Sequence, residues 1–274
     1  MKVIVESGAT KTVWCAIFKD GSTRSIKTDG VNLAIAPGNS FSTLMQKAIA
    51  ALNPNFENIT EIHVYAAGLV EPRTMGNVEY SSDLLGAARA VCGRTPGIAA
   101  ILGTGSNSCF YDGVNIVNKV RSGGFILGDE GSASCLGKLF ISDFLKGMVP
   151  QTIADEFASE FDSDYATIVK QVYKGDAPSK YLGSFAPWLW HRFDKDEYVH
   201  NLILSNFESF FDRSLCHYDT DRYPVGLVGG FAYVAKDILT ELAGKRGICI
   251  SKVLETPVEG LLNYHMETGN GDEW

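Results

Sequence analysis

Short runs of β-prone residues, separated by turn residues, dominate the start of the chain. The runs Val3–Glu6, Thr12–Phe18 and Thr23–Lys27 are interrupted at Ser7-Gly8 and at Asp20-Gly21. Small or acidic residues next to glycine are typical of tight turns between strands. The pattern therefore predicts a meander of three antiparallel strands.

Helices and strands then alternate, and a second meander follows. Ser40 is placed to cap the first helix, and Ser81 or Ser82 the second, because serine accepts hydrogen bonds from the first backbone amides of a helix. Asp112-Gly113 is a strong hairpin signal. The elements predicted for this stretch are a helix over 40–52, a strand over 61–67, a helix up to Val91, and strands over 98–102, 108–111 and 114–120.

After Gly131 the spacing of apolar residues becomes helical, since they recur at intervals of three and four. We expect mostly helices from Pro150 to Tyr218. The predicted elements beyond this stretch are a strand over 225–228, a helix over 232–242, a strand over 248–250 and a helix over 257–266.

This order of elements predicts an α/β protein made of two similar halves. The first domain is expected over 1–95, with the last helix, about 257–274, packing back on it. The second is expected over 96–256, with a helical insertion at about 150–220. The halves are not visibly similar in sequence, so the duplication is inferred from element order alone.

Composition excludes several classes of protein. The chain of 274 residues is 45% hydrophobic and 20% charged, which is ordinary globular usage. Its net charge of −8, with no basic stripe, argues against a nucleic-acid partner. No apolar stretch reaches the length needed to cross a membrane. The six cysteines form no CxxC pair, so we expect reduced, mostly buried thiols and a cytoplasmic location.

Two glycine-bearing hairpins are candidate phosphate sites. Glu6 to Thr12 and Gly103 to Asn107 each join two predicted strands with small and hydroxylated residues. Such loops let backbone N–H groups approach phosphate oxygens. Glu6, at the end of the first strand, is placed to hold Mg²⁺ through water. A plain β-turn explains either hairpin alone, but two of them, each starting a meander, favour the phosphate interpretation.

Two further stretches carry glycines. Asp129 and Glu130 lie in the segment Gly123 to Ser132, just before a predicted helix, where they either cap the helix or contact a ligand. The segment Gly226 to Phe231 joins a strand to a helix through Gly229-Gly230, leaving room for a flat ring such as adenine or for a close helix–strand crossing.

Two single polar residues also stand out. Asp83 precedes a run of small apolar residues and is a candidate general base or a helix cap. Asn32 is a turn residue whose side chain both donates and accepts hydrogen bonds. The alternative for each is a purely structural role, as a helix cap for Asp83 and as a loop residue for Asn32.

In order and spacing, these motifs resemble the N-acetylglucosamine kinase and BadF/BadG/BcrA/BcrD ATPase family. The resemblance covers nearly the whole chain, and its most specific parts are Gly103-Thr104-Gly105-Ser106-Asn107 and Gly128-Asp129-Glu130-Gly131-Ser132. That family belongs to the actin, hexokinase and Hsp70-like ATPases. The resemblance implies two ribonuclease-H-like domains with a central cleft for ATP and sugar.

The resemblance also implies roles for individual residues. These are Asp83 as catalytic base, Glu6 for Mg²⁺, Thr10, Lys11, Thr104, Gly105, Gly229 and Gly230 for ATP, and Asn32, Asp83, Gly124, Phe125 and Asp129 for the sugar. Three positions depart from the family pattern. Many members carry Asp at Glu6, relatives can carry Trp at Phe125, and close relatives often carry Asp at Val13.

The function predicted from the resemblance is ATP-dependent phosphorylation of an amino sugar, most simply N-acetylglucosamine to its 6-phosphate. Two alternatives stay open at this stage: an ATPase that activates a redox enzyme and carries an iron–sulfur cluster, and a sugar sensor without catalysis. The aromatic segment Phe185–Phe193 is expected either in the core of the insertion or at a homodimer contact.

Overall fold

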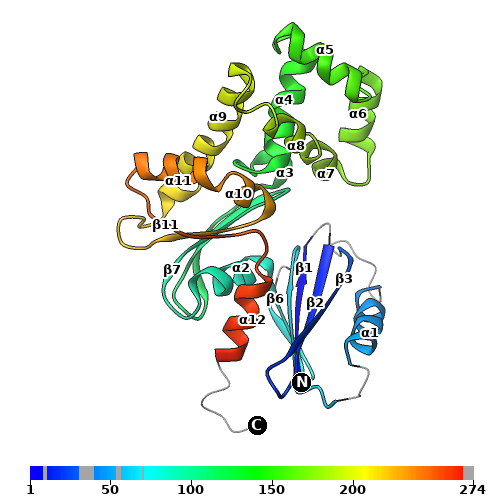
Figure 1. Ribbon diagram of the computed structural model, residues 1–274, viewed down its shortest axis with the longest axis vertical. Coiled ribbons are helices and arrows are strands. Elements are labelled where there is room, and N and C mark those ends of the chain that lie inside the picture. The colour runs from blue at the N-terminus through cyan, green and yellow to red at the C-terminus, as the bar shows by residue number, and fades with distance from the viewer. Residues whose placement is uncertain (9–10, 31–39, 54–56, 70, 268–274) are drawn as a thin grey trace. The chain divides into compact units, whose positions relative to one another are not determined.

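A six-stranded sheet organises the first part of the computed structural model, which describes residues 1–8, 11–30, 40–53, 57–69 and 71–267 (Figure 1). Its strands are β1 (Lys2–Ser7), β2 (Lys11–Ile17), β3 (Thr23–Asp29), β4 (Glu61–Ala66), β5 (Arg73–Met75) and β6 (Val78–Ser82). Their order is β3-β2-β1-β4-β6-β5. Strands β1 to β3 form the predicted antiparallel meander, and β1, β4 and β6 run parallel to one another.

Helices pack on the two faces of this sheet. Helix α1 (Ser40–Leu52) shares a core with alternate side chains of the strands, among them Val3, Val5 and Trp14. The intervening positions, Glu6 among them, point to the other face. Helices α2 (Asp83–Cys92) and α12 (Val258–Met266) pack on each other and on the strands, α2 directly over Tyr65.

The second sheet repeats the strand order of the first. Its strands are β7 (Gly97–Leu102), β8 (Ser106–Tyr111), β9 (Ile116–Val120), β10 (Val225–Val228) and β11 (Ile250–Leu254). Read from one edge, their order β9-β8-β7-β10-β11 matches β3-β2-β1-β4-β6. The two-fold repetition expected from element order is therefore confirmed, and the protein has the two-sheet α/β fold that the sequence predicted.

Helices fill the chain between β9 and β10. They are α3 (Gly124–Leu127), α4 (Ala133–Leu145), α5 (Gln151–Glu160), α6 (Tyr165–Lys174), α7 (Pro178–Gly183), α8 (Ala186–Trp190), α9 (Glu197–Arg213) and the 3₁₀ turn η1 (Leu215–His217). Helices α10 (Gly230–Val234) and α11 (Lys236–Lys245) follow β10.

By its contacts the chain forms two units. The first contains Met1–Ala99, Cys109–Asn118 and the segment that begins at Thr256. The second contains Ala100–Ser108 and Lys119–Glu255. Each unit is described by itself below. Within the described residues no helix is long and apolar enough to cross a membrane.

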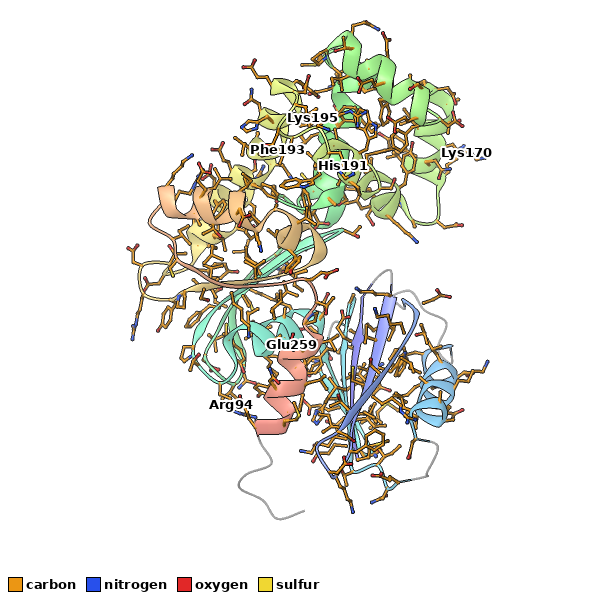
Figure 2. The ribbon with its side chains drawn as sticks, in the orientation of Figure 1. Arg94, Lys170, His191, Phe193, Lys195 and Glu259 are labelled. Atoms are coloured by element: carbon orange, nitrogen blue, oxygen red, sulfur yellow. The ribbon has the colours of Figure 1, made fainter. Side chains whose placement is uncertain are left out.

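The aromatic segment lies in the core of the helical insertion. Phe185, Trp188 and Phe193 are all at least 93% buried, and Figure 2 labels Phe193 among these helices. The Arg192 guanidinium lies 3.7 Å from the centre of the Trp188 ring and pairs with Glu156 and Glu160. Core packing, one of the two interpretations of this segment, therefore accounts for its aromatic residues.

Several local predictions were wrong. Strands β5 and β6 and helix α3 were not predicted, because β5 is fully exposed and α3 is only four residues long. The predicted helix over 232–242 is two helices, since the backbone of Ala235 leaves the helical region (φ −93°, ψ 14°). The last strand begins at Ile250 and not at Ile248. The thiols are free, but Cys216 and Cys249 are exposed and Cys92 is half-buried.

Candidate active site

Three parallel strands of the first unit end side by side. The strand register pairs Ser7 of β1 with Ala66 of β4, and Ala66 with Ser82 of β6. Glu6 and Asp83, which adjoin Ser7 and Ser82, are thereby brought to the same edge of the sheet. Carboxyl ends of parallel strands are the usual ligand-binding edge of α/β sheets.

The hairpin after β1 is closed by side chains as well as backbone. The hydroxyls of Ser7 and Thr12, both fully buried, are 2.9 Å apart. The amide of Gly8 donates to the carbonyl of Lys11 at 3.0 Å. A Cβ at Gly8 would lie 3.6 Å from Glu6 Oε1, so the Glu6 carboxyl lies beside the hairpin.

Burial raises the pKa of Glu6 to about 7. The charge of Lys11 opposes this shift of the pKa, and the negative charge of Asp83 adds to it. The carboxyls of Glu6 and Asp83 therefore interact electrostatically. The residue opposite Glu6 on β2 is Val13, which is buried and offers no charge.

Asp83 occupies the first position of helix α2. The N-cap is Ser82, whose hydroxyl accepts a hydrogen bond from the Leu85 amide, so the capping interpretation of Asp83 was wrong. Asp83 Oδ1 accepts a hydrogen bond from the Leu84 amide at 2.8 Å. Burial raises the pKa of Asp83, and this hydrogen bond only partly offsets the effect.

The Glu6–Asp83 pair fits a hydrated cation. Two carboxyls with raised pKa values are stabilised as anions by a positive charge. Mg²⁺ keeps several waters and binds proteins through one or two carboxylates, so a sparse donor set of this kind suits it.

In the second unit the hairpin between β7 and β8 is built from backbone contacts. The carbonyls of Gly103 and Thr104 accept hydrogen bonds from the amides of Ala133 and Ser134, the first two residues of α4, at 2.9 and 3.0 Å. The next amide, that of Cys135, donates to the Ser132 hydroxyl. The free amides at the start of α4 are therefore used to hold the hairpin in place.

Asp129 is held against this hairpin. Its side chain is 93% buried, and its φ of +58° is the one positive value among the described non-glycine residues. A Cβ at Gly105 would lie 2.9 Å from Asp129 Oδ2. Burial raises the pKa of Asp129, while a hydrogen bond from the Ser106 amide and the charge of Lys138 oppose the rise. Asp129 does not cap α4, because Ser132 does.

Asn206 is a polar residue of this site that the sequence did not reveal to us. Fully buried on α9, it accepts a hydrogen bond from the Gly131 amide at 3.0 Å and donates to the Ser132 carbonyl at 3.1 Å. It thereby holds the end of the acidic segment. The available signal was an asparagine on the apolar stripe of a helix, between Ile203 and Phe210.

Helix α3 carries the predicted sugar residues Gly124 and Phe125. It begins after Gly123 in a left-handed conformation (φ +74°). The Lys138 ammonium donates to the Phe125 carbonyl at 2.9 Å. A Cβ at Gly124 would meet nothing within 4 Å, so the surface beside it is open. Ile126 and Leu127 are 71% and 81% exposed.

Gly229 and Gly230 differ sharply in their surroundings. Gly229 has a φ of +132°, and a Cβ there would lie 2.3 Å from the Leu102 carbonyl oxygen and 3.2 Å from the Gly103 nitrogen. A Cβ at Gly230 would meet nothing within 4 Å. The close helix–strand crossing therefore explains Gly229, and the open surface expected for a ligand lies at Gly230.

The structure thus gathers the predicted residues into two groups. Glu6, Lys11 and Asp83 interact in the first unit. In the second unit, one hairpin contains Thr104 and Gly105, and Asp129 and Gly229 pack against it. Lys138 links this group to α3, because its charge acts on Asp129 and its ammonium donates to the Phe125 carbonyl. Thr10 and Asn32 lie outside the described residues.

Solved structures similar to this one cover nearly the whole chain. A protein of Porphyromonas gingivalis, provisionally named an N-acetylglucosamine kinase, is 33% identical with a TM-score of 0.88, covering 97% of this chain and 99% of that one. A protein of Chromobacterium violaceum with the same provisional name is 17% identical (TM-score 0.78, 96% and 98% covered). A ROK family glucokinase from Streptomyces griseus, solved with glucose and AMPPNP, is 12% identical (TM-score 0.53, 96% and 97% covered). No family model and no curated protein sequence matches.

The two more distant structures show the fold alone, whereas the 33% identity to the first extends over nearly the whole of both chains. The chain therefore belongs to the N-acetylglucosamine kinase family of the actin-like ATPase fold. It is a sugar kinase, in agreement with the motifs of its sequence.

Proposed function

We propose that the protein transfers the γ-phosphate of ATP to an amino sugar, N-acetylglucosamine, at the 6-hydroxyl. The observation that carries the proposal is that Glu6 and Asp83 lie at the carboxyl ends of two parallel strands of one sheet, beside a hairpin, where the charge of Asp83 acts on the pKa of Glu6. Phosphoryl transfer needs positioning, charge neutralisation and one proton acceptor. The first unit has a candidate cation ligand for charge neutralisation, Glu6, and a candidate proton acceptor, Asp83, at a single edge of its sheet.

Asp83 is the proposed catalytic base. As the sugar oxygen forms its bond to the γ-phosphorus, the bond from phosphorus to the ADP oxygen breaks, and the hydroxyl proton passes to the Asp83 carboxylate. Burial raises the pKa of Asp83, which makes the carboxylate a better proton acceptor. The hydrogen bond from the Leu84 amide to Oδ1 leaves Oδ2 to face the substrate.

Glu6 is the proposed residue for Mg²⁺. When bound, the ion neutralises phosphate charge and polarises the transferred group. The carboxyl beside Gly8 and the positive charge of Lys11 lie at the hairpin where the phosphates are expected. Without a cation, two neighbouring carboxyls and a triphosphate would repel one another in this acidic protein.

The second unit supplies backbone surfaces for ATP and sugar. We assign Thr104, Gly105 and Gly230 to the nucleotide, with Gly229 setting the close strand crossing beside them. Gly124, Phe125 and Asp129 are assigned to the sugar, since α3 presents an open surface at Gly124 and a half-buried aromatic ring next to it. Thr10 and Asn32 complete the two sets by family pattern.

The substrate is tested by measuring ADP release with N-acetylglucosamine, glucosamine, N-acetylmannosamine and glucose. We expect kcat/KM to be highest for N-acetylglucosamine, in line with the provisional name of the 33% identical relative. A higher value for another sugar would replace that assignment. Sugar binding without turnover on any of them would indicate a sensor.

The base is tested with Asp83→Asn, which keeps the shape of the side chain and removes the proton acceptor. Loss of a general base costs about 10²–10⁴-fold in rate. We expect that loss in kcat, with the sugar Kd measured by calorimetry changed less than about tenfold. Asp129→Asn is the matched comparison, because its carboxylate is held by the Ser106 amide. Turnover of Asp83→Asn within about threefold of the wild type would reject Asp83 as the base.

A further inference from the structure

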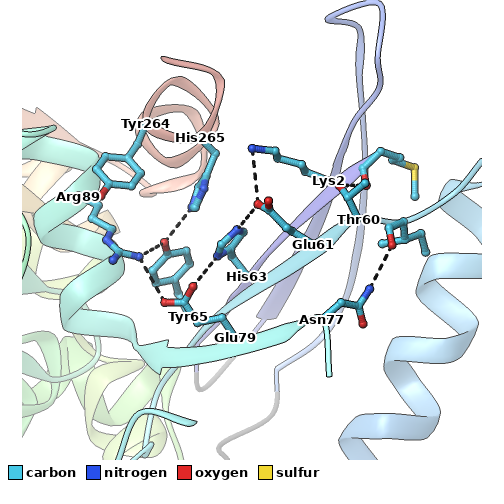
Figure 3. A network of polar contacts seen from close by, with 12 residues as sticks. Lys2, Thr60, Glu61, His63, Tyr65, Asn77, Glu79, Arg89, Tyr264 and His265 are labelled. Carbon is cyan, nitrogen blue, oxygen red and sulfur yellow. Dashed lines mark hydrogen bonds and ion pairs between the residues drawn. The ribbon is translucent and has the colours of Figure 1, made fainter. Parts of the chain in front are cut away.

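Figure 3 shows a network of polar side chains of the first unit that includes Tyr65, His63, Arg89 and His265. At its centre is the hydroxyl of Tyr65 on β4, the residue paired with Glu6 across the parallel strands. Arg89 Nη1 of α2 donates to this hydroxyl at 2.7 Å, and His265 Nε2 of α12 lies 2.8 Å from it. One oxygen therefore joins a strand, α2 and α12.

The protonation of His265 bears on the direction of these hydrogen bonds. Burial, reinforced by the charges of His63, Arg89, Lys2 and Arg94, lowers the pKa of His265 to about 2. The ring is therefore neutral. In the tautomer with its proton on Nδ1, Nε2 accepts the proton of the Tyr65 hydroxyl, while the guanidinium of Arg89 donates to the oxygen.

Helix α2 rests directly on the ring of Tyr65. A Cβ at Gly86 would lie 2.9 Å from Cβ, Cγ and Cδ1 of that ring, so α2 approaches the sheet as closely as its backbone allows. Gly86 is three residues after Asp83 and lies on the same side of the helix. The height of the first turn of α2 above the sheet is therefore set by Tyr65.

Helix α12 packs against α2 and against the strands of the sheet. A Cβ at Gly260 would lie 2.4 Å from the Ala90 carbonyl oxygen, which shows how closely the two helices cross. Arg94 Nη1 donates to the Tyr264 hydroxyl at 3.4 Å, and its guanidinium lies 4.2 Å from the centre of that ring. Figure 2 shows Arg94 beside α12.

We infer that Tyr65 and His265 are positioning residues for the phosphoryl transfer: through the Tyr65 hydroxyl, α12 and β4 fix helix α2 and with it the carboxylate of Asp83. The role assigned to Asp83 rests on the proposed function. A base must reach the sugar hydroxyl within about 3 Å, and a displacement of about 1 Å can cost about 10²-fold in rate. The hydrogen bonds that join the Tyr65 hydroxyl to Arg89 and His265 form a junction between β4, α2 and α12. This junction keeps the first turn of α2 from making such a displacement.

The first experiment removes single atoms from the junction. Tyr65→Phe keeps the ring under Gly86 and deletes the hydroxyl. We expect kcat to fall about tenfold or more, with the KM for ATP within about twofold of the wild type. Tyr80→Phe is the matched control, because Tyr80 lies on the opposite face of the same sheet with Phe41. Equal kcat for Tyr65→Phe and Tyr80→Phe would overturn the inference.

The second experiment separates hydrogen bonding from packing at His265. His265→Gln retains a group that can accept the Tyr65 proton, and His265→Phe retains a ring against His63, whose centre is 4.2 Å away. We expect His265→Gln to keep most of the kcat and His265→Phe to lower it as Tyr65→Phe does. The opposite ranking would overturn the inference, since packing would then be the role of His265.

A double-mutant cycle tests whether the junction acts through Asp83. If it does, Tyr65→Phe lowers kcat in the wild-type background but not in the Asp83→Asn background. Independent tenfold losses in both backgrounds would overturn the inference while leaving Asp83 as the base. If Asp83→Asn is itself fully active, the proposed function fails instead. In that case, hydrogen exchange of the amides of residues 84–87 tests by itself whether Tyr65 fixes the first turn of α2. Faster exchange in Tyr65→Phe supports this role of Tyr65, and unchanged exchange overturns it.

Discussion

The two hairpins that begin the two sheets occupy the same place in the strand order and are built in different ways. The hairpin after β1 is closed by the buried Ser7 and Thr12 hydroxyls and lies beside two carboxyls with raised pKa values. The hairpin after β7 offers its carbonyls to the first amides of α4. The repeat thus closes one hairpin with side-chain hydroxyls and holds the other through its backbone, while a buried acid with a raised pKa, Asp129, also lies against the second. A duplicated fold can build the same loop in two ways.

The largest effect on stability is expected from a substitution at Gly229, which packs against the backbone of Leu102 and Gly103 where the second hairpin begins. Gly229→Ala places a Cβ 2.3 Å from the Leu102 carbonyl oxygen at a φ of +132°. We expect a loss of about 3 kcal/mol in the free energy of unfolding, measured by urea denaturation. Gly230→Ala is the control, since its Cβ meets nothing within 4 Å. It should leave stability within about 0.5 kcal/mol and weaken ATP binding. Equal stability of the two variants would contradict the close crossing.

The side-chain chemistry of the first hairpin is tested by pH. Because the pKa of Glu6 is raised to about 7, its contribution to stability is complete below the unfolded value near 4.5 and is lost as pH rises through 7. Without Mg²⁺, the stability of Glu6→Gln relative to wild type should therefore increase from pH 5 to pH 8, by about 2 kcal/mol.

Adding Mg²⁺ at pH 8 should stabilise the wild type and not Glu6→Gln, as measured by thermal unfolding. Asp20→Asn is the control: the pKa of Asp20 is lowered by hydrogen bonds from Ser22, so its contribution is lost only as pH falls below 5. A pH-independent difference between Glu6→Gln and wild type would show that Glu6 is an ordinary exposed carboxylate.

The acidic segment of the second unit depends on one buried amide. Asn206→Ala leaves the Gly131 amide without its Asn206 partner and the Ser132 carbonyl with the Leu136 amide alone, which should cost about 2 kcal/mol of stability. The KM for sugar should rise with it. Asn201→Ala, at an exposed position of the same helix, should change neither. If both alanine variants behave alike in denaturation and kinetics, Asn206 does not hold the segment.

The smallest effect is expected at the ion pair between Arg213 and Glu130. The two charges are 3.2 Å apart, but the Arg213 side chain is 68% exposed. Exposed pairs contribute about 0.2–1 kcal/mol. Arg213→Ala should therefore shift the unfolding midpoint by less than about 0.5 kcal/mol and leave the sugar KM unchanged. A larger shift would mean that side-chain charge, and not backbone shape, holds this half of the site.

The sequence was most informative where local chemistry decides structure. The turns after Glu6 and Leu102 were predicted because glycine and small residues have few other uses between strands. The strand over Val225–Val228 is apolar throughout and was found with its exact bounds. Strand β5, with three exposed residues, carries no such signal, because its pairing with β6 alone makes it a strand.

The site was predicted by residue type and missed where long-range contacts decide. Asp83 was found as a lone acid before small apolar residues, and Asp129 as one of two adjacent acids in a glycine-rich segment, but their partners were not found. The hydrogen bond from Asn206 to the Ser132 carbonyl joins residues 74 positions apart. The hydrogen bond from the Ser106 amide to Asp129 requires the turn at Asp129 itself. Neither contact has a local pattern, so only the fold reveals it.

The return of the chain at Thr256 has a consequence for synthesis. Tyr65 and His265 are 200 positions apart, so a ribosome must produce the whole of the second unit before α12 can seat on α2. Until then the nascent first unit exposes the face that α12 will cover, with Ala90 and the hydroxyl of Tyr65 on it. Contacts of such long range slow folding and expose apolar surface on the way. We therefore expect the nascent chain to be a client of chaperones until α12 leaves the exit tunnel.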